Sequence, residues 1–316
     1  MIVVLTGGTG GAKFVDGLRK VVPPRDLTFI VNTGDDFEWW GLHISPDVDS
    51  ITYILSDLLS KDRGWGVDGD TFQCLEAMKR LGQPAWFQIG DRDLSTHFLR
   101  TQLMRQGKTL TEATAEITRN LEIESTVLPM TNWAVETRVT IPEGEISFQD
   151  YFVRRGFRDP VSAVRFSGAE KATAATGVIE AILSAEMILL APSNPVTSIG
   201  PILAVPCVRK ALQETSAPIG AVSPIVGGTA VSGPAGALMT AQKLPVSVAG
   251  VVDTYQDFLD FLIVDSADAQ AAQELARAGL DVHCTNTIMK TNDDRTELAR
   301  AVLSFVSKFK KLEVAS

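Results

Sequence analysis

The chain has 316 residues, of which 45% are hydrophobic and 21% charged, so it can bury a sizeable core and is not disordered. Its formal net charge of −9 argues against a surface for duplex nucleic acid, and no apolar run approaches membrane-spanning length. The three cysteines, Cys74, Cys207 and Cys284, are odd in number and lack CxxC spacing, which indicates reduced thiols. We therefore expect a cytoplasmic protein that binds neither nucleic acid nor membrane.

The first elements in the chain predict an anion site. Residues 2–5 are branched and apolar, typical of a strand buried on both faces, and residues 12–22 read as a helix with one apolar side. Free backbone N–H groups and the positive end of a helix converge at such a turn, and missing Cβ atoms let a phosphate approach. We predict that a phosphate is bound by the residues between and beside these elements: Gly7, Gly8, Thr9, Gly10, Gly11 and Lys13.

The spacing of these glycines leaves the nucleotide open. No Gly-Lys-Ser/Thr closes the loop as in a P-loop, and Ala12 stands where the dinucleotide fingerprint has its third glycine. A tight turn without any ligand is the alternative.

Four aspartates follow the second predicted strand, residues 27–31. Asp35 and Asp36 stand at its carboxyl end, where ligands collect in an open parallel sheet, and Asp47 and Asp49 precede a helix expected over residues 51–59. An oxygen-only cluster without a histidine pair suits Mg²⁺, with Asp36 and Asp49 as its predicted ligands. The alternative is that Asp49 or Ser50 merely caps the helix.

The stretch from about residue 50 to 165 does not keep the alternation of strands and helices. It reads as a mainly helical insertion that forms one wall of a cleft. We expect helices at 70–81, 94–105 and 109–121, the last with a capping box of Thr109 and Glu112, and strands at 85–89, 123–128, 137–141 and 146–149. Arg92, between Asp91 and Asp93, either makes a local ion pair or contacts a ligand.

Alternation returns in the second half. We expect strands at 187–191, 219–222, 246–251, 261–264 and 282–284, and helices at 177–185, 268–278 and 293–309. The first of these strands leads into Ser193-Asn194-Pro195, which either binds a nucleoside or forms an Asx turn. The predicted fold is α/β: one domain over residues 1–316 with a doubly wound, mostly parallel Rossmann-like sheet. An apolar helix face near 199–212 favours a homodimer.

Taken together, the motifs resemble the 2-phospho-L-lactate transferase family, which acts in biosynthesis of the deazaflavin coenzyme F-420. The resemblance runs in order over nearly the whole chain, through GGTGGAKF (7–14), NTGDD (32–36), SPDVDS (45–50), GDRDLSTH (90–97), PSNPVTSIGPIL (192–203), SPIVGG (223–228) and SGPAG (232–236). Related nucleotide-sugar-binding regulatory proteins share the glycine loop and the SNP turn, whereas the aspartate motifs fit the transferase better.

The resemblance implies the substrates and the roles of the motifs. The family transfers a phospho-acid group from a guanosine diphosphate ester to the ribityl hydroxyl of a deazaflavin precursor, releases GMP and uses Mg²⁺. It implies that Gly7–Lys13 bind the diphosphate, that Ser193, Asn194 and Pro195 bind the nucleoside, and that Asp49, Asp91 and Arg92 belong to the deazaflavin site. The acid carried (phospholactate, phosphoenolpyruvate or phosphoglycerate) is not fixed by any of these motifs.

Phosphoryl transfer depends on positioning and charge neutralisation more than on covalent catalysis, which agrees with these motifs. We predict Asp49 as the first choice for accepting the hydroxyl proton, with Asp36 as a second catalytic acid. Trp39 or Trp40 either stacks on the deazaflavin or packs in the core. A non-catalytic nucleotide-sugar sensor and, more weakly, a nicotinamide-dependent oxidoreductase are the rival functions.

Overall fold

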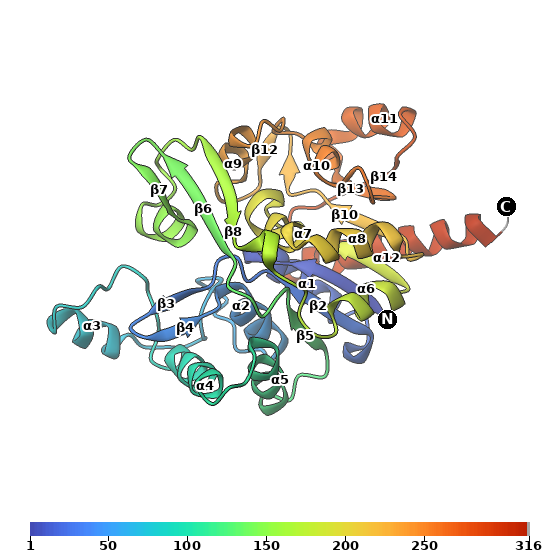
Figure 1. Cartoon of the computed structure of the whole chain (residues 1–316). Helices are drawn as coiled ribbons and strands as arrows, with labels where there is room; N and C mark the ends of the chain where they lie inside the picture. Colours follow the sequence, from blue (N-terminus) through green and yellow to red (C-terminus); the bar gives the residue numbers. More distant parts are fainter. Residues whose placement is uncertain (315–316) are drawn as a thin grey trace.

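The computed structural model describes residues 1–314, with side chains through residue 306, and contains a central sheet of seven strands (Figure 1). All pairings between neighbouring strands of this sheet are parallel. In spatial order the strands are β14 (Asp281–Thr285), β13 (Phe261–Asp265), β10 (Ile219–Val222), β9 (Met187–Leu190), β1 (Ile2–Thr6), β2 (Leu27–Val31) and β5 (Thr126–Pro129). This is the doubly wound Rossmann order, extended by one strand, and it confirms the predicted fold class.

Alternation along β1 shows why these residues form a central strand. Val3 and Leu5 pack in one hydrophobic core, and Val4 packs in a second core on the opposite side of the sheet. Successive side chains of a strand point to opposite faces, so a continuous apolar run suits a strand that is covered on both.

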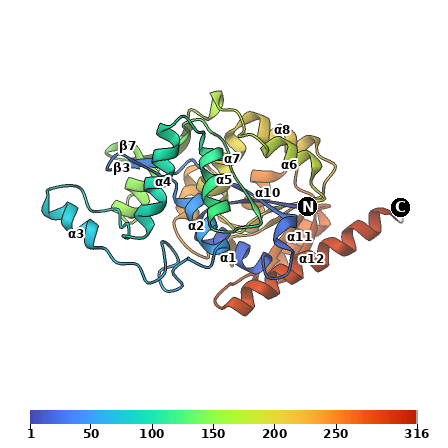
Figure 2. The same cartoon turned by 90° about the horizontal axis from the view of Figure 1, so that it is seen from below.

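Helices cover both faces of the sheet (Figures 1 and 2). The core around Val4 includes residues of α1 (Gly8–Leu18), α2 (Pro46–Leu55) and α12 (Asn292–Val314). The core around Val3 and Leu5 includes residues of α6 (Val178–Ser184), α7 (Gly200–Ala204), α8 (Pro206–Glu214), α9 (Ala235–Ala241), α10 (Val248–Tyr255) and α11 (Ala269–Arg277). The two cores therefore hold the sheet in the middle of three layers.

Much of residues 50–165 lies outside the central sheet, although β5 is its edge strand. An antiparallel sheet is built from β6 (Glu136–Ile141), β7 (Gly144–Ser147) and β8 (Ala163–Ser167), in the order β7-β6-β8. Three helices belong to the same stretch: α3 (Gln73–Arg80), α4 (Asp93–Arg105) and α5 (Leu110–Asn120). The predicted capping box is present, because Thr109 and Glu112 each bond to the other's backbone at the start of α5.

Two small antiparallel hairpins complete the described fold: β3 (Phe37–Trp39) with β4 (Leu42–Ile44), and β11 (Ile225–Val226) with β12 (Thr229–Ala230). Beside β3 and β4 lies a third, aromatic-rich cluster in which Trp39 is only 6% exposed. The ring of Trp39 packs edge-on against Trp86 at 4.9 Å, and Trp40 Nε1 donates to the carbonyl of Pro84. Trp39 is therefore a core residue rather than a free stacking surface.

Three predicted elements are wrong. Residues 85–89 form no strand, because Trp86 and Phe87 are held in the aromatic cluster by ring packing. Residues 246–251 contribute to helix α10 instead of a strand, since the Ser247 side chain accepts a hydrogen bond from Gly250 N and caps the helix. The helix expected from residue 51 begins earlier, at Pro46, a favourable residue for a first turn.

The apolar helix face that motivated the homodimer is largely buried within the chain itself. Ile199, Ile202 and Leu203 pack in the core on one side of the sheet, as do Val208 and Leu212. The oligomeric state stays a prediction.

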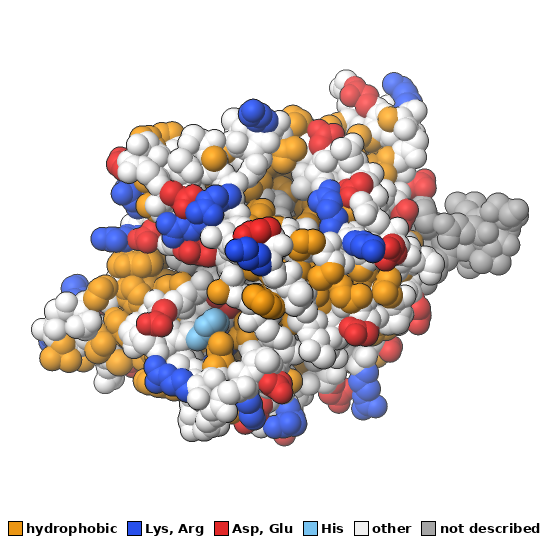
Figure 3. All heavy atoms as spheres, in the orientation of Figure 1, with side chains coloured by type: hydrophobic (Ala, Val, Ile, Leu, Met, Phe, Trp, Pro, Cys, Tyr) orange, Lys and Arg blue, Asp and Glu red, His pale blue; other side chains and the backbone are white. Residues whose placement is uncertain are grey.

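The surface of the described residues carries both charges. On the face shown in Figure 3, basic and acidic side chains are interspersed. Within the part of the chain that the structure describes, no helix has the length and apolar character to cross a membrane.

Candidate active site at the carboxyl edge of the sheet

The reversal of strand order places the candidate site. The chain runs from β1 outward through β2 to β5 and then returns to β9, on the other side of β1. In open α/β sheets, ligands bind outside the carboxyl ends of the strands at such a switch point. The glycine loop follows β1, and Ser193-Asn194-Pro195 follows β9. The two segments predicted to bind the nucleotide are therefore neighbours, although about 180 residues separate them.

Ser193 joins these two segments directly. Its hydroxyl donates to the Gly7 carbonyl at 2.7 Å and accepts from Gly7 N at 3.4 Å. Asn194 caps the next helical segment, Pro195–Ile199, because its side-chain oxygen accepts from Val196 N and Thr197 N. The Asx-type alternative thus accounts for the amide oxygen of Asn194, and Pro195 occupies a first-turn position.

The glycines allow the loop to approach other backbone closely. A Cβ on Gly10 would lie 2.4 Å from the Pro192 carbonyl oxygen, and one on Gly11 would lie 2.6 Å from the Ser193 hydroxyl. Gly8 has a φ of +67°, which favours glycine. Helix α1 begins at Gly8, and the side chain of Gly7 offers it no cap, so its first-turn N–H groups need partners from outside the helix. Thr9 and Lys13 are exposed on the same helix.

Asp47 ties the acidic edge to the start of α1. Its carboxylate accepts from Gly8 N at 2.8 Å and from the Asn32 side chain at 2.9 Å. Burial raises the pKa of Asp47 to about 6, against the lowering effect of these two hydrogen bonds. The first N–H of α1 is therefore bonded to an acid that titrates close to neutrality.

Asp35 is the least compensated acid of the group. Burial and the neighbouring charge of Asp47 raise its pKa well above the usual range. Its Oδ1 is buried and makes no hydrogen bond within the described residues. An orphaned buried carboxylate oxygen is costly, and it marks a place where a positively charged group would be stabilised.

Asp36 lies beside these two acids but has polar partners. Both of its oxygens accept from the Ser45 hydroxyl at 2.8 Å, and His43 Nε2 lies 3.0 Å from Oδ2. Burial still raises the pKa of Asp36, because it outweighs the hydrogen bond from His43. His43 was not predicted as a site residue, and its place between two aspartate motifs is the one signal in the sequence that points to it.

Asp49 has a different environment, because its partner is a buried arginine. It lies in the first turn of α2, whose N-cap is Ser45, so the alternative that Asp49 or Ser50 caps this helix is wrong. Both carboxylate oxygens pair with the guanidinium of Arg100, one of them at 3.1 Å, and His97 Nδ1 lies 3.5 Å away. Arg100 is 1% exposed, so this is a buried, bidentate ion pair.

Asp91 and Arg92, predicted for the deazaflavin site, have local partners instead of contacts with this group. The carboxylate of Asp91 accepts from Gln73 N and Cys74 N at the start of α3, and these bonds, with one from the Thr71 hydroxyl, lower its pKa. Arg92 is exposed and donates to the Asp68 carbonyl at 3.0 Å. Asp93 is the member of this motif that reaches the buried network, because Tyr53 donates to it at 2.6 Å.

The contacts of the four aspartates decide which of them can hold the predicted Mg²⁺. Among the described residues, no three His, Cys, Asp or Glu side chains are arranged to hold a metal ion. Mg²⁺ needs only one or two carboxylates when substrate phosphates complete its shell. The predicted ligand Asp49 does not fit, since Arg100 engages both of its oxygens, and Asp36 is engaged by Ser45 and His43. Asp35 fits better, because its buried Oδ1 makes no hydrogen bond within the described residues, and Asp47 adds a second negative charge close to it.

These features define a class of protein. A parallel sheet in Rossmann order, with a glycine-rich strand–helix turn at its switch point, makes this chain a Rossmann-like α/β protein. Crystal structures of a UPF0052-family protein from Bacillus halodurans agree in fold, with TM-scores of 0.63 and 0.62. Each covers 96% of this chain and 98% of its own, and at 16% identity the likeness shows the fold alone.

Sequence comparison identifies the family. Residues 2–303 match the model of the family described as 2-phospho-L-lactate transferase CofD. A 2-phospho-L-lactate transferase from Methanococcoides burtonii is 41% identical over 303 residues, which cover 96% of this chain and 98% of that protein. The enzyme of the same name from Methanosarcina mazei is 38% identical over 302 residues, covering 96% and 99%. The chain belongs to the 2-phospho-L-lactate transferase CofD family.

Proposed function

We propose that this protein transfers a phospholactyl group, or a close relative of it, from a guanosine diphosphate ester to a deazaflavin precursor in coenzyme F-420 biosynthesis. The terminal ribityl hydroxyl attacks the phosphorus distal to guanosine, the bond from that phosphorus to the bridging oxygen breaks, and GMP leaves. Family membership over residues 2–303 carries this proposal. The observed meeting of a glycine loop and buried acids at the switch point supports it.

The start of α1 suits the diphosphate. The positive dipole end of the helix lies here, and Ser193 holds the loop of Gly7 in place. We propose that the backbone from Thr9 to Gly11 binds the diphosphate, with Lys13 adding positive charge, while Gly8 N stays bonded to Asp47. Ser193, Asn194 and Pro195 lie next to it and form part of the nucleoside site.

The acids supply the second half of the site. We propose that Asp36 accepts the proton of the ribityl hydroxyl: its raised pKa makes it a better base than an ordinary aspartate at neutral pH. Asp35 and Asp47 would hold Mg²⁺, which when bound would neutralise the charge that develops on the departing GMP. Asp49 is assigned a structural partner, Arg100, rather than the proton.

Asp91 and Arg92 remain part of the proposed deazaflavin site. They belong to the GDRD motif at the start of α4, the helix whose Arg100 pairs with Asp49. The three cysteines are free in the structure, as a reducing compartment allows, and we propose a cytoplasmic location.

Product mass tests the proposal. The purified chain is incubated with the deazaflavin precursor, Mg²⁺ and a guanylylated ester of phospholactate, phosphoenolpyruvate or phosphoglycerate in separate reactions. One of the three should add the mass of its phospho-acid to the deazaflavin and release an equal amount of GMP. If no reaction changes the deazaflavin mass while calorimetry shows tight binding of a nucleotide sugar, the chain is a sensor and the proposal is wrong.

A further inference from the structure

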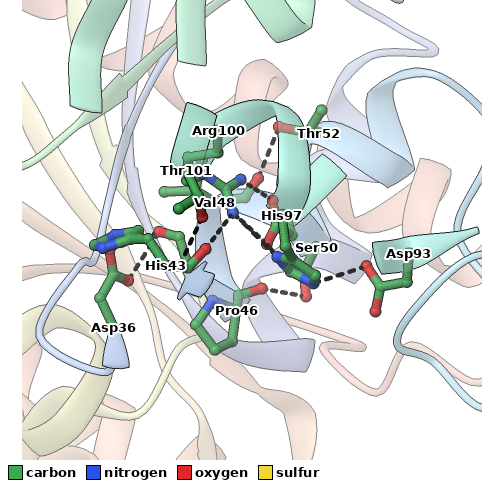
Figure 4. A network of polar contacts seen from close by, with 12 residues as sticks. Asp36, His43, Pro46, Val48, Ser50, Thr52, Asp93, His97, Arg100 and Thr101 are labelled. Atoms are coloured by element: carbon green, nitrogen blue, oxygen red, sulfur yellow. Dashed lines mark hydrogen bonds and ion pairs between the residues drawn. The ribbon is translucent and has the colours of Figure 1, made fainter. Parts of the chain in front are cut away.

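One face of α4 carries buried polar side chains that the proposed reaction does not use. Asp93, His97, Arg100 and Thr101 recur at the spacing of a single helix face, and all are at least nine-tenths buried. Figure 4 shows Arg100 and Thr101 beside His43, and His97 between Arg100 and Asp93. Such a face would usually be apolar, so the polar residues call for an explanation.

Two consecutive residues of this face hold the backbone of His43. Thr101 Oγ1 accepts from His43 N at 2.8 Å, and Arg100 Nη1 lies 3.5 Å from the His43 carbonyl oxygen. The ring of His43 then reaches Asp36, with Nε2 3.0 Å from Oδ2. A chain of contacts therefore runs from α4 through His43 to the proposed proton acceptor.

The central sheet does not fix this segment. His43 lies in β4, whose strand partner is β3, and this hairpin is separate from the seven-stranded sheet. The main-chain bonds that hold a core strand in register are therefore missing between β4 and the sheet. The contacts from α4 replace them at the residue whose ring touches Asp36.

Arg100 also fixes the second acidic segment. The same guanidinium that approaches the His43 carbonyl pairs with Asp49 in α2. His97 Nδ1 lies 3.3 Å from Nη1 of this guanidinium. Behind His97, its Nε2 lies 3.2 Å from Asp93, which also accepts from Tyr53. Burying two charges costs desolvation free energy that offsets much of their attraction. A buried ion pair is therefore weak evidence for a purely stabilising role.

We propose that Thr101 and Arg100 are positioning residues for the transfer reaction, which set the place of Asp36 through His43. This inference rests on the proposed function, in which Asp36 accepts the proton. Removing the Thr101 hydroxyl should leave the substrates bound but move the acceptor. A displacement of the acceptor by about 1 Å lowers turnover by roughly 10- to 100-fold.

The test uses the full chain and three variants of buried threonines. Thr101→Val keeps the shape and removes the acceptor, whereas Thr101→Ser keeps the hydroxyl. Thr118→Val is the matched control: Thr118 is also 7% exposed, and its hydroxyl bonds within α5, to the Thr114 carbonyl. For each variant we would measure kcat, KM for both substrates, the melting temperature and the ¹⁵N resonances of the histidine rings, with His43→Gln assigning His43.

We expect Thr101→Val to lower kcat by about 10-fold or more with each KM within about 3-fold, and to shift the His43 ring resonances. Thr101→Ser should restore both, and Thr118→Val should change neither. Normal kcat in a folded Thr101→Val protein, or a loss that Thr101→Ser does not restore, overturns the inference.

A failure of the proposed function would look different. If the wild-type chain turns over none of the three donors, the transfer proposal fails, and the His43 resonances decide whether α4 positions that ring. Resonances that do not move in Thr101→Val then overturn the positioning of His43 by α4 as well, whereas resonances that move and are restored by Thr101→Ser keep that positioning and overturn only its link to transfer.

Discussion

Two sets of buried aspartates lie at the carboxyl edge of the sheet, and they differ in what surrounds their charge. Asp49 is paired through both oxygens with a buried arginine. Asp35, Asp36 and Asp47 have no such partner, and burial raises the pKa of all three. Membership of an aspartate motif therefore does not assign a role. An acid whose charge is paired within the protein is held in place, and one whose charge is unpaired can take up a cation or a proton.

The largest expected effect is a loss of turnover when an unpaired aspartate is changed. In Asp36→Asn the shape is kept and basicity is lost, so kcat should fall by roughly 10²–10⁴-fold, the range for losing a general base. The melting temperature should fall little, because a buried acid with a raised pKa is replaced by a neutral amide. Steady-state kinetics and thermal unfolding check this, with the exposed Asp57→Asn as control. A folded Asp36→Asn protein with near-normal kcat would contradict the role of Asp36.

The second effect concerns the stability of the paired acid. Arg100→Met leaves Asp49 as an uncompensated buried charge, and breaking a buried pair in this way costs about 3–5 kcal/mol of unfolding free energy. Arg165→Met, which breaks an exposed pair with Glu145, should cost far less, because solvent screens such a pair. Urea unfolding of both variants makes the comparison. Equal losses would show that the Asp49 pair is no more than a surface ion pair in its effect.

The third effect is the pH dependence of the unpaired set. The folded pKa of Asp47 is about 6 and its ordinary value is 3.8, so the folded state binds more protons than the unfolded state between these values. Unfolding free energy should therefore fall as pH rises from about 4 to 6, by about 3 kcal/mol from this residue, and stay low above. Denaturant titrations at several pH values, compared with Asp47→Asn, would measure it. If unfolding free energy instead rises between pH 4 and 6, and Asp47→Asn removes that rise, the predicted direction is wrong.

The smallest expected effect is on nucleotide binding by the glycine loop. Gly11→Ala brings a Cβ within 2.6 Å of the Ser193 hydroxyl and 2.3 Å of Thr6 Oγ1, so the loop and the Ser193 segment must separate. We expect the Kd for GDP to rise about 10-fold, which corresponds to roughly 1.4 kcal/mol. Gly236→Ala is the control, because its Cβ would meet Val246 at 3.4 Å. Calorimetry that finds equal Kd values for both variants would remove the loop from the nucleotide site.

The central strands were predictable because each signal is local. Residues 2–5 are a continuous apolar run, residues 27–31 and 219–222 are mostly apolar, and each forms a strand of the central sheet. The same signal failed at residues 85–89 and 246–251, where aromatic packing and a serine cap decided the structure. An apolar run can equally serve a buried loop or a buried helix, so periodicity alone could not separate these cases.

The site was predictable as a set of motifs but not as a set of contacts. The glycine loop, the SNP turn and the two aspartate motifs converge as the order of a doubly wound sheet requires. The pairing of Asp49 with Arg100 joins residues 51 positions apart, and it depends on how α4 packs against α2. No local pattern at either residue predicts that contact, so Asp36 and Asp49, and not Asp47, were the predicted metal ligands.

The most direct test of the division between paired and unpaired aspartates is the position of a bound cation. Crystals of the chain with GDP and Mn²⁺ in place of Mg²⁺ would locate the metal by anomalous scattering. We predict a peak within about 2.2 Å of carboxylate oxygens of Asp35 and Asp47, with the Asp49–Arg100 pair intact. A peak coordinated by Asp49, with Arg100 displaced from it, would contradict the account.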